Sequence, residues 1–267
     1  MGVDVRVVLF AGGQGLRIRE HSDEIPKPMV PIGSRPVLWN VMKWYAHHGH
    51  NDFVLCLGHK GEAIKRFFLN YDETTSNDFV LRKGGLDIEY QNRDIDDWTV
   101  RFIDTGLDAS IGERLLRVKK HLGDDQIFMA NYSDGVTDLD LDAYLGWFEK
   151  TDALASFVSV RPPLSYHVST ANDAGVVTGL DPIREIDQWI NAGYFIFRSA
   201  IFDYIAPGED LVVEGFQRLI SEGKLVTYQY RGFWAPLDTF KDKVVLDEMA
   251  ATGRGPWELW KPERNPG

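Results

Sequence analysis

The sequence predicts an α/β fold: a Rossmann-like, mostly parallel sheet with helices on both faces, formed as a single domain by residues 1–267. Apolar runs that are too short for helices alternate with amphipathic helical patterns, and the connections between them are short. This alternation is typical of βαβ units with right-handed crossovers. The first run, residues 5–10, is apolar apart from Arg6 and rich in β-branched residues, as expected of a strand buried on both faces of a parallel sheet.

The remaining elements follow from local patterns. A helical stripe begins at Pro36 and stops at Gly49, and a glycine turn at residues 58–61 leads into the next helix. Residues 71–85 are mostly polar and lack a clear helical or strand pattern. Residues 161–187 combine prolines with an Asn-Asp-Ala-Gly turn, which predicts loops with a short hairpin in this second segment. The expected strands are residues 5–10, 52–57, 86–91, 100–104, 126–130, 153–160, 188–197 and 225–230. The expected helices are residues 36–49, 62–70, 111–121, 141–150, 199–205, 211–222 and 240–250.

A loop of small residues leaves the first strand, and two cations follow it. Backbone N–H groups in such a loop can close around a phosphate or lie against a base. Arg17 comes next, and Lys27 is held between two prolines that stiffen its segment. Ile18 replaces the third glycine of a dinucleotide fingerprint, and the Gly-Lys-Ser/Thr of a P-loop is missing. We expect a polyphosphate site here, with an ordinary tight turn as the alternative. The small residues are Ala11, Gly12, Gly13 and Gly15.

Two isolated acids are candidate metal ligands. Asp134 comes shortly after the strand expected at residues 126–130, where open α/β sheets place ligand chemistry, and Asp238 follows a later strand and an aromatic segment. Carboxylate oxygens are the ligands that Mg²⁺ prefers. A turn or a helix cap is the alternative for each acid. His47 and His48 suit the negative end of a helix dipole, and a metal role is their less favoured alternative.

The composition predicts a soluble cytoplasmic protein. The chain is 44% apolar and 26% charged, and its net charge of −11 argues against a nucleic-acid binder, which needs a basic face. No apolar run approaches the ~20 residues of a membrane helix, and residues 1–4 are not expected to begin a signal peptide. The single cysteine, Cys56, lies in an apolar run and is expected to be unreactive core filling.

Further motifs extend the pattern along nearly the whole chain, in a fixed order. The chain resembles the sugar-phosphate nucleotidylyltransferases, and in particular the bacterial glucose-1-phosphate cytidylyltransferases. Several blocks in the right order are far more specific than one glycine motif. The resemblance is carried by residues 11–15 with Arg17, and by residues 26–30, 32–33, 104–106, 112–115, 134–140, 190–191, 232–239, 242–243 and 256–257.

The resemblance implies a nucleotide-diphospho-sugar transferase fold with a small sugar-side β region, and a specific reaction. An oxygen of a sugar 1-phosphate attacks the α-phosphorus of a nucleoside triphosphate, here CTP, and pyrophosphate leaves. Asp134 and Asp238 would hold Mg²⁺, while Arg17 would neutralise the pyrophosphate and Lys27 the α-phosphate. Arg114, with the backbone of the glycine loop, would lie beside the base and the triphosphate.

On the acceptor side the sequence departs from the family pattern. Asn191 matches a contact to a sugar hydroxyl, and Gly193, inside a strand, marks the close approach of a ligand or another backbone. The family's acceptor-phosphate lysine is absent, because residues 181–183 read Asp-Pro-Ile, and Arg184 is the nearby cation that could replace it. Ser133 stands where a glycine is usual.

These departures leave alternatives open. The acceptor could be a modified sugar, heptose or cyclitol phosphate, or the chain could be a non-catalytic homologue that binds nucleotide sugars. The resemblance also implies a homo-oligomer. Trp234, Trp257 and Trp260 would then serve subunit contacts or simply fill the core.

Overall fold

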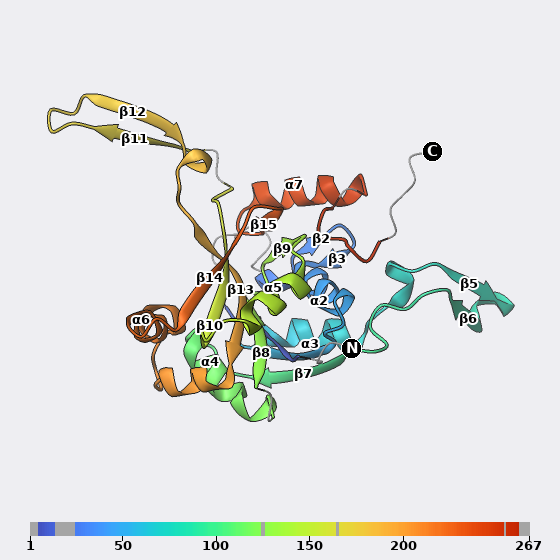
Figure 1. Ribbon diagram of the computed structural model, residues 1–267. Helices are drawn as coiled ribbons and strands as arrows, with labels where there is room; N and C mark the ends of the chain where they lie inside the picture. The colour runs from blue at the N-terminus through green and yellow to red at the C-terminus, as the bar shows by residue number, and fades with distance from the viewer. Residues whose placement is uncertain (1–4, 14–24, 124–125, 164–165, 254, 262–267) are drawn as a thin grey trace.

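A seven-stranded sheet forms the centre of the protein (Figure 1). The computed structural model describes residues 5–13, 25–123, 126–163, 166–253 and 255–261. The strand order is β14-β10-β13-β8-β1-β4-β7, and every strand is parallel to its neighbours except β13. The sheet confirms the predicted fold class. Its strands are β1 (Val7–Phe10), β4 (Asp52–Leu57), β7 (Thr99–Asp104), β8 (Ile127–Asn131), β10 (Ala155–Val160), β13 (Ile190–Arg198) and β14 (Leu225–Tyr230).

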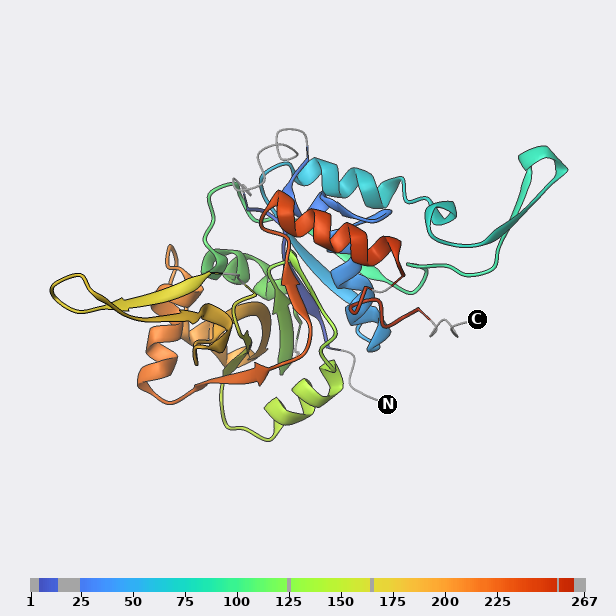
Figure 2. The ribbon, with the colours of Figure 1, turned by 90° about the horizontal axis from the view of Figure 1, so that it is seen from above.

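Two apolar cores cover the two faces of this sheet. Alternate side chains of β1 enter different cores: Val7 and Leu9 pack into one, and Val8 and Phe10 into the other. Figure 2 shows α2, α3 and α7 on one side of the sheet and α4 and α6 on the other. The α-helices are α2 (Val37–His47), α3 (Gly61–Leu69), α4 (Ile111–Val118), α5 (Leu141–Glu149), α6 (Phe216–Ser221) and α7 (Phe240–Ala251).

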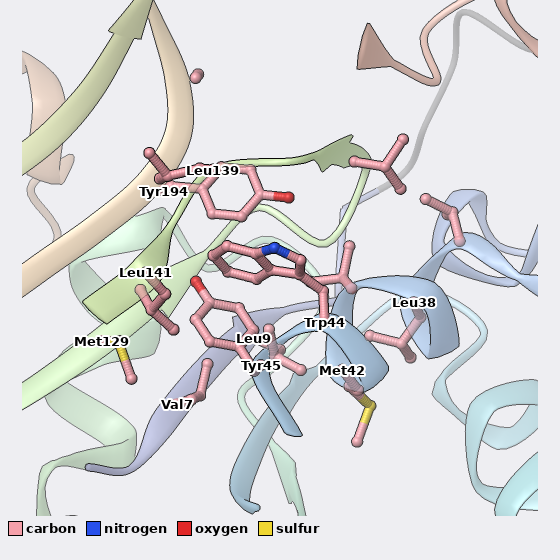
Figure 3. Packing of buried hydrophobic residues seen from close by; sticks show 14 of the residues in the cluster. Val7, Leu9, Leu38, Met42, Trp44, Tyr45, Met129, Leu139, Leu141 and Tyr194 are labelled. Atoms are coloured by element: carbon pink, nitrogen blue, oxygen red, sulfur yellow. The ribbon is translucent and has the colours of Figure 1, made fainter. Parts of the chain in front are cut away.

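The central core is rich in aromatic side chains. Figure 3 shows Trp44 and Tyr45 of α2 packed against Tyr194 of β13. The ring centroids of Trp44 and Tyr194 are 5.3 Å apart in an edge-to-face contact. Trp257 is fully buried and its Nε1 donates to Asn40 Oδ1 at 3.1 Å, so Trp257 fills the core of its own chain. No helix among the described residues has the length and apolar character to span a membrane.

Four small two-stranded sheets surround the main sheet, and two of them project as arms. Figure 1 shows the β5–β6 and β11–β12 hairpins extending from opposite sides of the body. The β11–β12 hairpin lies within the loop region expected at residues 161–187 and confirms the hairpin predicted there. The small sheets are β2 (Pro31–Ile32) with β3 (Arg35–Pro36), β5 (Phe79–Arg82) with β6 (Asp87–Tyr90), β9 (Gly135–Thr137) with β15 (Trp234–Pro236), and β11 (His167–Ala171) with β12 (Val177–Pro182).

Three expected α-helices differ from the structure in type, and the one expected at residues 111–121 ends in the 3-10 turn Lys119–His121. The segment expected as a helix at residues 199–205 is a 3-10 helix, Ser199–Tyr204. The helix expected at residues 211–222 begins with a π-helical turn, Leu211–Gly215, before α6. Helical periodicity alone does not separate these forms, because they place side chains on nearly the same face over one or two turns. Further 3-10 turns are Lys27–Met29, Glu73–Thr75, Lys83–Gly85 and Ile183–Glu185.

Candidate active site

The carboxyl edge of the sheet brings together the loops that follow β1, β4 and β7. Ala11, directly after β1, is buried, and its N–H donates to Cys56 O of β4 at 3.1 Å. Gly12 O accepts the N–H of His59 at 3.2 Å. A Cβ on Gly12 would lie 2.8 Å from Gly58 N and would also strike the Arg114 guanidinium, so only glycine fits there. Gly13 is exposed, and a Cβ there would meet no described residue within 4 Å.

Arg114 holds these three loops in place. Ser110 caps α4 by accepting the Glu113 N–H at 3.1 Å, and this start places Arg114 on the first turn, toward the sheet edge. The guanidinium donates to Gly12 O after β1, to Leu57 O at the end of β4, and to Thr105 Oγ1 and Leu107 O after β7, at 2.7 to 3.3 Å.

The side chain of Arg114 is only 3% exposed, and burial lowers its pKa from the ordinary value. The terminal N–H groups of Arg114 donate to three backbone carbonyls and one hydroxyl of this chain, so the described contacts of its guanidinium support the loops of the site. The sequence-based prediction of a residue beside the base and the triphosphate stays a prediction.

A rigid segment positions Lys27. Lys27 lies between two buried prolines, Pro26 and Pro28, and is the first residue of the 3-10 helix Lys27–Met29. The Val30 N–H donates to Lys27 O at 3.0 Å, which closes the turn. The backbone is therefore fixed, and the half-buried side chain extends from it to the acids of the site.

A short two-stranded ladder brings Asp134 and Asp238 together. Asp134 directly precedes β9, Asp238 follows β15 by two residues, and Gly135 of β9 pairs with Pro236 of β15. The Leu237 N–H also donates to Asp134 O at 2.7 Å. Two acids that are far apart in the chain thus lie side by side. The local sequence around each acid did not predict the strand pairing that brings them together.

Lys27 bridges the two acids. Its Nζ lies 2.6 Å from Asp134 Oδ2 and 2.5 Å from Asp238 Oδ1. Burial lowers the pKa of Lys27, but the ion pairs with Asp134 and Asp238 raise it by more, so the group stays charged. Burial raises the pKa of Asp134, the Lys27 ammonium lowers it, and the net pKa lies above the ordinary value.

The two acids fit a divalent cation. One small cation, the ammonium nitrogen, contacts an oxygen of each carboxylate, so these oxygens already converge on one position. Mg²⁺ is held in proteins by one or two carboxylates together with water and substrate phosphates. The helix-cap alternative for Asp238 is wrong, because Thr239 caps α7 in a capping box with Asp242 and leaves the Asp238 side chain to the site.

The support beneath Asp134 was not foreseen from the sequence. Asn131 Oδ1 accepts the Ser133 N–H at 2.6 Å, and Tyr194 OH donates to Gly135 O at 2.8 Å. Asn131 and Tyr194 are both almost fully buried, so these bonds fix the turn on each side of Asp134. The only signal in the sequence is a polar residue, Asn131, at the end of an apolar strand.

The acceptor-side candidates lie where β13 begins. Because β13 is antiparallel, its first residues reach the same edge as the carboxyl ends of its neighbours. Asn191 Oδ1 accepts the Gly193 N–H at 2.8 Å. Gly193 has a φ of +80°, and a Cβ there would lie 2.6 Å from Tyr132 Cδ2, so its close approach is to a side chain.

Some candidates cannot be placed. Gly15 and Arg17 lie outside the described residues. Arg184 belongs to the 3-10 turn Ile183–Glu185 beside the β11–β12 arm, and its side chain is likewise not described. Their roles stay predictions.

A second group of possible ligand atoms involves one of the two histidines. Single atoms of His48, Asp140 and Asp142 lie within 4.8 Å of one another. Both carboxylates are exposed, and Asp140 already caps α5 by accepting the Ala143 N–H at 2.9 Å. Exposed acids at a helix start are common without a metal, so this group is weaker than the Asp134–Asp238 pair.

Comparison with known proteins identifies the family. A family model described as nucleotidyl transferase matches residues 6–244. The chain belongs to this family. This nucleotidyltransferase is 33% identical, over 258 residues, to a glucose-1-phosphate cytidylyltransferase of Salmonella typhimurium, and the match covers 96% of this chain and 100% of that protein. Both findings confirm the family that the sequence motifs indicate.

A more distant relative matches in sequence, and a solved structure shares the fold. This nucleotidyltransferase is 24% identical over 266 residues to a mannose-1-phosphate guanyltransferase of Gibberella zeae, covering 96% of this chain and 67% of that protein. A crystal structure of a UDP-glucose pyrophosphorylase complexed with UDP-glucose superposes with a TM-score of 0.68 at 13% identity, covering 94% of this chain and 100% of that one.

Proposed function

We propose that this nucleotidyltransferase transfers the CMP group of CTP to a sugar 1-phosphate, giving a CDP-sugar and pyrophosphate. The observation that carries the proposal is the convergence of Lys27, Asp134 and Asp238 beside the glycine-loop edge of the sheet. The choice of CTP rests on the full-length similarity to the Salmonella typhimurium protein, whose name gives that activity.

The reaction requires position and charge neutralisation. A phosphate oxygen of the sugar phosphate attacks the α-phosphorus of CTP, the bond from that phosphorus to the bridging oxygen breaks, and pyrophosphate departs with the electron pair. The Gly12–Gly13 backbone lies at the sheet edge where the nucleotide would enter. The half-buried Lys27 ammonium lies beside the proposed metal ligands, where it would neutralise negative charge that develops on the α-phosphate. Arg17 would neutralise the pyrophosphate.

Asp134 and Asp238 would hold Mg²⁺. Bound there, Mg²⁺ would neutralise the phosphate oxygens and fix their geometry for in-line transfer. The fixed backbone around each acid, through the β9–β15 ladder and the capping box of α7, keeps the two carboxylates in place without the metal.

We also propose that the acceptor side is specialised. Asp181 and Pro182, where the family's lysine is expected, are paired with Val168 and His167 in the β11–β12 arm. Because no lysine stands at these positions, the acceptor phosphate would be held by a different cation, with Arg184 as the candidate. A modified sugar, heptose or cyclitol phosphate is therefore the second candidate acceptor.

Pyrophosphate release tests the function. We would measure it with each of the four ribonucleoside triphosphates, Mg²⁺ and a panel of sugar 1-phosphates. Turnover with CTP and glucose 1-phosphate, better than with all other acceptors, supports the main proposal and removes the specialised-acceptor proposal. Turnover only with another phosphate supports the specialised acceptor. Binding of CTP without any turnover would instead support a non-catalytic nucleotide-sugar-binding role.

A further inference from the structure

The Lys27 ammonium lies at the position between the two acids that suits a metal. Its Nζ contacts one oxygen of Asp134 and one oxygen of Asp238, at 2.6 and 2.5 Å. A divalent cation that takes these same two oxygens at about 2.0 to 2.1 Å would collide with the ammonium and repel it. The ammonium and the metal therefore cannot share the two acids in this arrangement.

We propose that Lys27 is a built-in substitute for the metal in the free enzyme, and that it must leave the acids before a divalent cation binds between them. In the free enzyme the lysine neutralises Asp134 and Asp238 and holds them in position. When the nucleotide binds, its phosphates offer the ammonium a new anionic partner, and the vacated carboxylates take the cation. The inference rests on the proposed function, because the phosphates that draw the lysine away belong to the nucleotide.

The local structure permits this exchange. The backbone of Lys27 is fixed by the 3-10 turn and by the Val30 N–H bond to Lys27 O, so the residue does not need to move as a whole. The side chain is a flexible four-carbon stem that carries a point charge, and rotation about its bonds relocates the ammonium while the backbone stays in place.

The exchange couples the metal to the nucleotide. In the absence of nucleotide the metal must displace a paired ammonium, so it binds weakly. A ligand that draws the ammonium away raises the metal affinity, and by linkage the metal raises the affinity for that ligand by the same factor. The enzyme would thus avoid holding a metal ion between its acids before its substrate arrives.

Manganese binding without nucleotide tests the proposal. Mn²⁺ is titrated into the nucleotide-free protein, and free Mn²⁺ is followed by electron paramagnetic resonance. Lys27→Met removes the charge but keeps the length of the side chain, and we expect it to bind one Mn²⁺ at least about tenfold more tightly than the wild type. Lys65→Met is the matched control, because it removes a lysine that pairs with an acid, Glu62, on exposed helix α3 and should not change Mn²⁺ affinity.

Further variants show where the additional Mn²⁺ binds and whether the loss of Lys27 disturbs folding. Adding Asp134→Asn to Lys27→Met should abolish the gain, which places the bound ion at these acids. Lys27→Gln provides a second neutral variant, and circular dichroism shows which variants fold. Equal Mn²⁺ affinity in wild type and a folded Lys27 variant would overturn the proposal. So would stoichiometric Mn²⁺ binding by the nucleotide-free wild type, a measurement that needs no variant.

The test is separate from that of the proposed function, because it uses neither CTP nor a sugar phosphate. Tighter Mn²⁺ binding by Lys27→Met together with silence in the pyrophosphate assay would keep the lysine–metal exchange and reject the transfer reaction. Turnover in the pyrophosphate assay together with unchanged Mn²⁺ affinity of Lys27→Met would keep the transfer reaction and reject the lysine–metal exchange.

Discussion

Ser133 occupies a backbone conformation that favours glycine. Its φ is +64°, and its fully buried hydroxyl has no hydrogen-bond partner among the described residues. A left-handed conformation costs a non-glycine residue about 1 kcal/mol, so we expect Ser133→Gly to raise the free energy of unfolding by about that amount. Urea denaturation measures it. Ser133→Ala is the control, because it removes the hydroxyl but keeps the backbone strain, and an equal gain in both variants would show that strain is not the cause.

Cys56 is predicted to be unreactive in the folded protein. It is fully buried in β4, and burial raises the pKa of its thiol to about 12. The thiolate is the reactive form, so at pH 8 the native protein should react with a thiol reagent only through unfolding, with one equivalent appearing at once in denaturant. The reaction rate would then report global opening. Rapid labelling of the native protein would contradict this.

At the residue scale the sequence identified several groups but not the ion pairs and hydrogen bonds that they form within this chain. Lys27, Asp134 and Asp238 were each predicted from local context, and the structure brings them together. The resemblance placed Arg114 beside the nucleotide, which stays a prediction, and the structure adds four acceptors of this chain that its guanidinium contacts. A motif shows that a residue type is required, but its hydrogen-bond partners come from loops that are distant in the sequence.

At the scale of elements, one buried acid ties α2 to the base of the β5–β6 arm. Asp94 is 8% exposed, and its carboxylate lies 3.3 Å from Lys43 Nζ of α2. It also accepts hydrogen bonds from Tyr71 and Asn77, at 3.0 and 2.9 Å. Burial raises the pKa of Asp94, but Ser76, Lys43, Tyr71 and Asn77 together lower it by more, so its net pKa lies below the ordinary value.

This lowered pKa fixes a pH dependence. The stabilisation from Asp94 is complete above the unfolded pKa of about 3.9 and is lost as the pH falls through the lower folded pKa. We expect Asp94→Asn to reduce the free energy of unfolding by about 3 kcal/mol at pH 7, because the buried Arg35 guanidinium and the partly buried Lys43 ammonium lose a charged partner. The difference from the wild type should shrink below about pH 4. Urea denaturation across pH 3–7 checks it, and a difference that does not change with pH would contradict the account.

The strands of the main sheet, which have clear sequence patterns, were predicted well, whereas β5 and the β9–β15 ladder were not. The strand expected at residues 52–57 matches β4 residue for residue, because an uninterrupted apolar run follows Asp52. β5 was missed, since its residues are exposed and its partner β6 stabilises it. The β9–β15 ladder, which brings Asp134 and Asp238 together, was also missed. Each of its strands has only three residues, too few for a sequence pattern, and is defined by its pairing with the other.

At the scale of the whole molecule, the β5–β6 arm bears exposed apolar side chains that suit a subunit contact. Leu81 and Leu86 are 57% and 89% exposed, and Phe79 and Ile88 are also exposed. Apolar side chains gathered on a projecting hairpin mark an interaction surface. We propose that this arm contacts another copy of the chain. Replacing residues 80–89 with Asn-Gly, a tight turn between Phe79 and Tyr90, should reduce the sedimentation coefficient to that of a smaller assembly.

Two outcomes would contradict the arm contact. One is a wild-type protein that sediments as a monomer, and the other is a shortened variant that keeps the wild-type assembly. The double variant Leu81→Ser with Leu86→Ser is a milder check, because it keeps the hairpin and removes only exposed apolar surface.

The overall fold could be read from the sequence because alternation of strands and helices limits the sheet to few topologies. The antiparallel insertion of β13 could not, since its apolar run looks like that of a buried parallel strand. The acceptor side was the least predictable part, because the segment that lacks the family lysine forms a strand of the β11–β12 arm.

The most direct test of the central claim is pyrophosphate release from CTP and glucose 1-phosphate with Mg²⁺, by the wild type and Asp134→Ala side by side. We predict turnover by the wild type that stops when the metal is chelated, and a loss of more than about a hundredfold in kcat for a folded Asp134→Ala protein. A folded Asp134→Ala protein that keeps metal-dependent activity would contradict the assignment of the site.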